Sequence, residues 1–80
     1  MIATPGVIEL ADGGPRVRRV MHVEHGHVGN LKLIGGRWKF KAVGYGADGA
    51  VHPGGGPFTH RHDAIVDAPD AALVERALLG

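Results

Sequence analysis

Lysine and arginine residues concentrate in the middle of this 80-residue chain, where their number and spacing could bind an anion. Seven of the nine lie between residues 16 and 41, a segment whose only acidic residue is Glu24. The flanking segments 1–15 and 42–80 are both net negative, so the formal net charge of +1 hides a strongly basic centre. Segregated charge focuses electrostatic potential on the surface that such a segment forms. That surface would attract a negatively charged partner.

The basic residues alternate with apolar residues in two runs that flank Gly35 and Gly36. A Gly-Gly pair suits a two-residue hairpin turn, which would place Lys32 opposite Lys39. Because side chains alternate across a strand, one face would then hold the cations and the other the apolar groups. A slip of one residue would bury lysines, so the register is strongly specified. The predicted apolar face comprises Leu31, Leu33, Trp38 and Phe40, and the basic face comprises Lys32, Arg37, Lys39 and Lys41.

Like charges directly opposite each other destabilise a sheet, and an anion would relieve them. A nucleic-acid backbone presents many phosphates, and neutralising them with lysines releases counterions. We therefore expect a nucleic acid, or alternatively an acidic protein surface, as the partner of this face. The same alternation also describes the solvated side of an ordinary amphipathic sheet. The candidate anion-binding residues are Lys32, Arg37, Lys39, Lys41 and Arg18.

Arg18 belongs to a preceding segment, 16–24, that does not alternate cleanly. A three-residue turn at 25–27 would put Arg18 and His22 on the same side as the lysines, and a two-residue turn would reverse the assignment. The sequence leaves both arrangements open, and Arg19 interrupts the alternation in either case.

Six histidines are a high number for this length. In a strand His60 and His62 would point the same way, and two imidazoles with Asp63 could bind Zn²⁺, Ni²⁺ or Cu²⁺. The same short pattern is typical of exposed loop histidines, so we predict no resident metal and keep His60 and His62 as the candidates. Imidazoles titrate near neutral pH, so full protonation would add six positive charges and strengthen anion binding in mild acid.

The residue types argue against catalysis. The chain contains no cysteine and no serine, and Thr4 and Thr59 carry its only aliphatic hydroxyls. No hydroxyl or thiol therefore stands with a base in a nucleophilic arrangement. We predict a non-enzymatic binding module that needs no cofactor.

Turn signals recur about every ten residues, as expected for short strands joined by tight turns. The candidate strands are 7–10, 16–24, 28–34, 37–45, 50–52 and 62–66. We predict an antiparallel β-meander of three to four strands, with its central hairpin at about 28–45.

The C-terminus changes to a helical period. Asp67 and Asp70 flank Pro69, which suits a capped helix start, and Ala71, Val74 and Leu78 form an apolar stripe. A helix over about 68–79 would pack this stripe on one face of the meander. The fold class is therefore α+β, and residues 1–80 form one small domain without a linker.

The sequence has no run of about 18 apolar residues for a membrane span and no basic-then-apolar leader at residues 1–5. We therefore expect a cytoplasmic protein without a membrane partner. A second class of function is a protein-interaction, accessory or inhibitor module, including a homodimer, that uses a strand edge or the glycine-rich segment 53–57. A third is a histidine-based metal binder.

Overall fold

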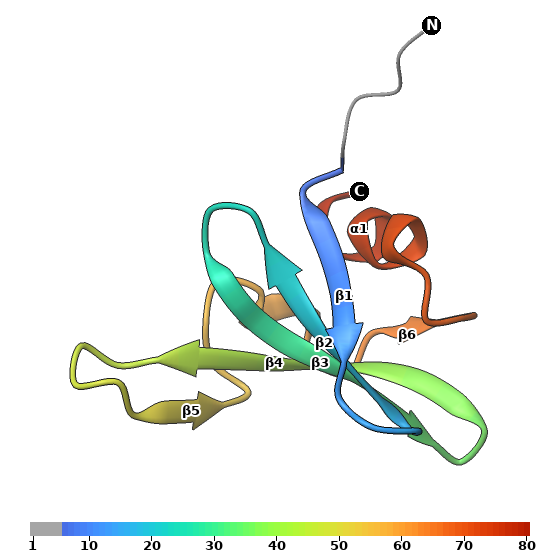
Figure 1. Cartoon of the computed structure of the whole chain (residues 1–80), viewed down its shortest axis with the longest axis horizontal. Coiled ribbons are helices and arrows are strands. Elements are labelled where there is room, and N and C mark those ends of the chain that lie inside the picture. The colour runs from blue at the N-terminus through green and yellow to red at the C-terminus, as the bar shows by residue number, and fades with distance from the viewer. Residues whose placement is uncertain (1–5) are drawn as a thin grey trace, which may run out of the picture.

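A computed structural model of the protein describes residues 6–80, and the prediction about a leader concerns residues 1–5, which lie outside the described residues. The described residues form short strands followed by a single C-terminal α-helix (Figure 1). The strands are β1 (Ile8–Asp12), β2 (Val17–His22), β3 (Gly26–Ile34), β4 (Arg37–Tyr45), β5 (Val51–Pro53) and β6 (Ile65–Val66). A 3₁₀ turn, η1 (Thr59–Arg61), precedes β6, and the helix α1 (Ala71–Leu79) ends the fold.

The strands form one antiparallel sheet in the order β1-β2-β3-β4-β5, which confirms the predicted α+β meander. The sheet has six strands, more than the three to four expected, because β4 pairs with two short strands along its outer edge. Val43 to Tyr45 pair with β5, whereas Trp38 and Lys39 pair with β6. The strong twist of the sheet turns β1 across the direction of β4 (Figure 1).

The β3–β4 hairpin has the predicted register, with Leu31 opposite Phe40 and Lys32 opposite Lys39. Its turn residues Gly35 and Gly36 have φ angles of 58° and 77°. Two consecutive positive φ angles define the primed turn that matches the twist of the flanking strands, and glycine adopts them without steric cost.

The β2–β3 hairpin has neither of the turns that the sequence left open, although it places Arg18 and His22 on the core side of the sheet, as the two-residue alternative predicts. Its three-residue turn is at 23–25, because His22 pairs with Gly26. The pairing then passes from Met21–His27 to Val20–Gly29, which leaves Val28 as an extra residue on β3. Such a β-bulge changes which side chains face the core. Val28 is fully buried.

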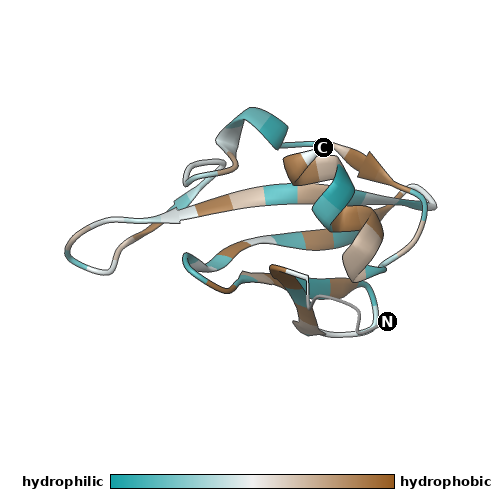
Figure 2. Cartoon of the chain, turned by 90° about the horizontal axis from the view of Figure 1, so that it is seen from above, coloured by the Kyte–Doolittle hydropathy of each residue, from teal (hydrophilic) through white to brown (hydrophobic). Residues whose placement is uncertain are grey.

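The hydrophobic core lies on one side of the sheet, where α1 and the segment 54–64 cover it. Leu31 and Phe40 from the central hairpin are fully buried, together with Val74 from α1. Phe58 from the segment before η1 joins the same cluster. Figure 2 shows α1 against strands along which hydrophobic and hydrophilic residues alternate. The core therefore occupies one face of the sheet.

The helix begins later than predicted, at Ala71, because Asp70 and not Asp67 is its N-cap. The Asp70 carboxylate accepts a hydrogen bond from the Leu73 backbone N–H at 3.1 Å, which satisfies one of the free donors of the first turn. Within residues 6–80, no helix has the length and apolar character that a membrane crossing needs.

The helix is also tied to the start of the sheet by a polar contact. The Oε1 atom of Glu75 accepts hydrogen bonds from the backbone N–H groups of Val7 and Ile8, at 2.6 and 3.2 Å. This contact satisfies two donors at the beginning of β1 and holds α1 against that strand.

The glycine-rich segment 54–56 packs directly on the backbone of β4. A Cβ atom added to Gly44 would lie 2.5 Å from the backbone nitrogen of Gly56, closer than van der Waals radii permit. The glycines at this contact therefore allow the two backbones to approach each other closely. Phe58, which follows this segment, packs in the core. The segment serves as a packed connection in the fold.

Candidate anion-binding face

The lysine residues of the central hairpin project from the side of the sheet opposite the core, which we call the outer face. Directly opposed residues on antiparallel strands project to the same side, so Lys32 and Lys39 share this face. Asn30 and Lys41 form the next outward-facing pair. Neighbouring strands lie about 4.8 Å apart and alternate residues about 6.8 Å apart. The resulting basic face consists of Arg19, Lys32, Arg37, Lys39 and Lys41.

The prediction that Arg18 joins the basic face is wrong. Arg18 pairs with Leu31 and therefore faces the core side of the sheet. Its guanidinium carbon lies 5.5 Å from the centre of the Trp38 ring, a distance suited to a cation–π interaction. The same group donates hydrogen bonds to the backbone carbonyls of Gly14 and Val17, at 2.9 and 3.0 Å. The Arg18 guanidinium thus has hydrogen-bond acceptors and an aromatic contact within the protein, at the edge of the core.

Arg19 takes the place predicted for Arg18. It pairs with Asn30, which itself pairs with Lys41, so the three side chains form a row across β2, β3 and β4. Two consecutive residues on a strand point to opposite faces, so the Arg18-Arg19 pair had to place one arginine on each side. The bulge at Val28 decides which one faces outward.

Within residues 6–80, Lys41 is the one member of the basic face with an acidic partner. Its ammonium group forms an ion pair and hydrogen bond with the Oδ1 atom of Asp63. The hydrogen bond from Lys41 is the main reason that the pKa of Asp63 is lowered, and the charges of His62 and Lys39 act in the same direction. Asp63 adopts a φ angle of 72°, and it holds its carboxylate beside the edge of β4.

The remaining cations of the basic face have no such partner. In the part of the chain that the structure describes, Lys41–Asp63 is the only ion pair that involves a lysine or arginine. Lys32 and Lys39 therefore stand opposite each other with their mutual repulsion uncompensated by an ion pair. Phosphate oxygens would supply the missing negative charge.

The histidines do not converge on a metal position. His60 lies in η1 instead of a strand, so it does not share a face with His62. The Nδ1 atom of His62 accepts a hydrogen bond from the Ala42 backbone N–H at 3.0 Å. His22, His25 and His60 surround the Phe58 ring, with centroid distances of 5.8, 6.4 and 6.3 Å. Across residues 6–80, no three histidine or acidic side chains are arranged to hold a metal ion.

A second polar group lies on the outer face beside the basic face. The Tyr45 hydroxyl and the Nδ1 atom of His27 are 2.6 Å apart, and the Nε2 atom of His27 lies 2.9 Å from the Oδ1 atom of Asn30. Asn30 is itself flanked by Arg19 and Lys41. The hydrogen bonds of Tyr45, His27 and Asn30 therefore connect the end of β4 to the row that Arg19, Asn30 and Lys41 form.

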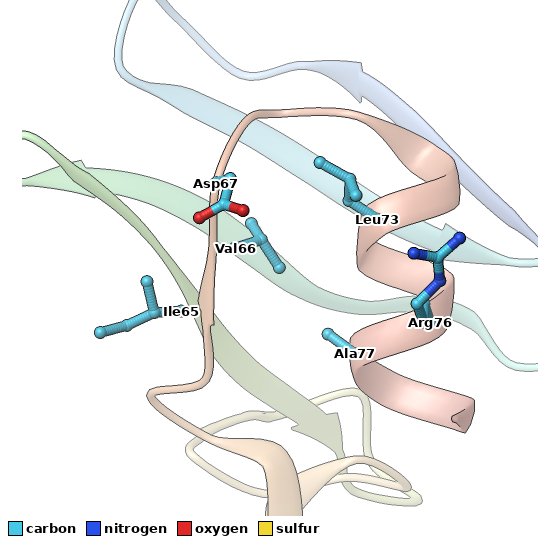
Figure 3. Close-up of a pocket in the computed structure, with 6 residues that line it drawn as sticks. All are labelled: Ile65, Val66, Asp67, Leu73, Arg76 and Ala77. Carbon is cyan, nitrogen blue, oxygen red and sulfur yellow. The ribbon is translucent and has the colours of Figure 1, made fainter.

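A groove of ≈ 270 Å³ separates β6 from α1 on the core side of the molecule. Figure 3 shows Leu73 and Ala77 directed toward β6, whereas the guanidinium of Arg76 is turned away from it. The Asp67 carboxylate and Arg76 thus do not converge on a common point. The lining residues are Ile65, Val66, Asp67, Leu73, Arg76 and Ala77.

Comparisons of the chain with models of protein families, with curated proteins and with solved structures find no match.

Proposed function

We propose that this protein is a non-enzymatic module of the cytoplasm that binds the phosphate backbone of a nucleic-acid duplex through its basic face. The observation that carries the proposal is the opposed pair Lys32 and Lys39, which has no ion-pair partner within residues 6–80. A sheet tolerates this repulsion at a cost to stability. Binding of phosphates converts the repulsion into attraction and releases counterions from the nucleic acid.

The arrangement of cations suits the charge density of a duplex. Double-stranded DNA carries one negative charge per about 1.7 Å of helix axis. The basic face extends across β2, β3 and β4, with cations on neighbouring strands or on alternate residues of one strand. Several phosphates of one duplex therefore fall within reach of the face at once.

The neighbouring strands favour contact with the backbone over entry into a groove. A two-stranded ribbon can enter the major groove, but β2 pairs with β3 through Lys32, and β6 pairs with β4 at Lys39. The two lysines therefore lie inside a wider sheet, and only the hairpin end with Arg37 extends beyond it. Contacts to phosphates carry little sequence information, so we expect binding with little sequence preference.

Fluorescence anisotropy with a labelled 16-base-pair duplex tests the proposal. We expect affinity to fall steeply between 50 and 200 mM salt, as is typical of phosphate contacts. The double variant Lys32→Gln/Lys39→Gln should reduce the slope of log K against log salt by about two, because each lysine accounts for about one released counterion. A matched control, Arg61→Gln/Arg76→Gln, removes the same charge from η1 and α1 and should leave more of the binding intact.

Two results would contradict the proposal. Binding that does not respond to salt, or an equal loss in both double variants, would show that net charge and not this face determines affinity. Tight, salt-sensitive binding of a poly-glutamate peptide together with no binding of the duplex would assign the face to an acidic protein.

A further inference from the structure

Tyr45 is the only tyrosine of the chain, and it lies on the outer face at the end of β4. Its side chain is half exposed, with a relative accessibility of 51%, although its hydroxyl is within hydrogen-bond distance of the Nδ1 atom of His27. The two rings are 5.9 Å apart between centroids. The hydrogen bond fixes the position of the phenol while its ring remains open to solvent.

His27 links this ring to the basic face. In the neutral imidazole with its proton on Nε2, Nδ1 accepts a hydrogen bond from the Tyr45 hydroxyl and Nε2–H donates one to Asn30 Oδ1, which satisfies both ring nitrogens. Because its oxygen is engaged, Asn30 keeps its amino group available between Arg19 and Lys41. An oriented aromatic ring, an amide donor and two cations therefore occupy one continuous part of the outer face.

These groups match the parts of a nucleotide. A base stacks on an aromatic ring regardless of its sequence, and the adjacent phosphate is recognised by cations and amide donors. Val51 pairs with Tyr45 and is also exposed, at 56%, so it extends the apolar surface that a base would cover. We infer that Tyr45, held by His27, stacks one unpaired base next to a duplex whose phosphates bind the basic face.

The number of aromatic rings limits the ligand to one stacked base. Trp38, Phe40 and Phe58 belong to the core side of the sheet, so Tyr45 is the only phenylalanine, tyrosine or tryptophan on the outer face. Tyr45 lies four residues beyond Lys41 on the same strand, a distance of about 13 Å at the rise of an extended chain. This spacing places the Tyr45 ring beside the basic face and not between its cations. The preferred ligand is therefore a duplex that continues into a single strand, and this inference rests on the proposed function.

Competition between two ligands tests the inference. The first is a blunt 12-base-pair hairpin, and the second is the same hairpin with a four-nucleotide overhang whose first base is 2-aminopurine. We expect wild-type protein to bind the overhang ligand at least about fivefold more tightly, from the energy of one stacked base. Binding should also quench the 2-aminopurine fluorescence, whereas Trp38 fluorescence should stay unchanged because that ring lies on the other face.

The variants separate this inference from the proposed function. Tyr45→Leu should abolish the overhang preference and the quenching while leaving affinity for the blunt hairpin unchanged, and Tyr45→Phe should retain most of the preference. Lys32→Gln/Lys39→Gln should weaken both ligands by the same factor. Equal affinity of wild-type protein for the two ligands, or a preference that survives Tyr45→Leu, would overturn the inference and leave the basic-face proposal standing. Failure of wild-type protein to bind either ligand would overturn both.

Discussion

The two faces of the β3–β4 hairpin are built from the same strands, yet their environments are opposite. On the core side, Leu31 and Phe40 are fully buried beneath α1 and the segment that carries Phe58. On the outer side, two like charges lie opposite each other, at the exposed Lys32 and the partly buried Lys39. The core face thus stabilises the fold, whereas the outer face holds two lysines whose repulsion no ion pair within residues 6–80 compensates. Substitutions should therefore separate folding from binding.

The largest effect should come from removing the aromatic ring at the centre of the core face. Phe40→Ala should reduce the free energy of unfolding by about 3–5 kcal/mol, because a fully buried ring is lost and a cavity remains. Urea denaturation followed by circular dichroism measures this change. The control Ile34→Ala, at an exposed position of the same hairpin, should cost about 0.5 kcal/mol or less. Equal losses for the two variants would contradict the assignment of faces.

The second largest loss of stability should come from removing the hydrogen bonds that tie Glu75 of α1 to the start of the sheet. Glu75→Ala should cost about 1–3 kcal/mol, because the backbone N–H groups of Val7 and Ile8 lose their shared acceptor. Glu75→Gln keeps an oxygen acceptor at this position and should cost less. Hydrogen exchange of these two amides, which should quicken in Glu75→Ala, reports the contact directly. Unchanged exchange would show that the contact contributes nothing to the fold.

On the outer face, reversing one charge should stabilise the protein while weakening its binding. Lys32→Glu places opposite charges across the strand pair and should add about 0.2–1 kcal/mol to the free energy of unfolding. The same change should sharply reduce duplex affinity, because it removes a cation and introduces an anion. Thermal melting and anisotropy on one sample would reveal the opposite signs. A loss of both stability and binding would show that the two faces are not separable.

The smallest effect on binding should come from substitution of Asp63, which forms an ion pair with the Lys41 ammonium group. Asp63→Asn frees Lys41 and should raise duplex affinity a fewfold, since one repulsive carboxylate leaves the edge of the basic face. Asparagine tolerates the positive φ angle of this position, so the backbone should be retained. Lower or unchanged affinity at low salt would place Lys41 outside the binding surface.

The same variant has a defined pH dependence. Because Lys41 lowers the pKa of Asp63 below its ordinary value of 3.8, the ion pair stabilises the folded state at all pH values well above 3.8. That stabilisation is lost as the pH falls through the lower pKa of the folded protein. Any stability difference between wild type and Asp63→Asn should therefore be present at pH 7 and vanish in strong acid. Thermal melting at pH 7 and near pH 2.5 checks this sign.

The central hairpin was predictable because two independent signals agree on its register. Gly35-Gly36 specifies the turn, and the alternation on both sides specifies which residues face the core. The sequence indicated candidate strands at 50–52 and 62–66, but the predicted sheet had only three to four strands, because segments as short as β5 and β6, of three and two residues, show no alternation that assigns them to a sheet. Both short strands form by backbone pairing with the free edge of the long strand β4.

The placement of Arg18 and Arg19 could not be predicted in the same way. It depends on the bulge at Val28, whose presence is decided by packing of that side chain in the core and not by a local turn signal. The contact of Glu75 with Val7 joins residues 68 positions apart, and no pattern in the sequence indicates it. The hydrogen bonds of Tyr45 and His27 likewise follow from the tertiary fold.

The most direct measurement of the central claim is an NMR titration of ¹⁵N-labelled protein with a 12-base-pair duplex. We predict that shift changes collect on the outward-facing residues of β2, β3 and β4, with the largest at Arg19, Lys32 and Lys39, and that the amides of α1 remain unchanged. Shifts that gather on α1 and the groove beside β6, or that are absent at saturating duplex, would contradict the account.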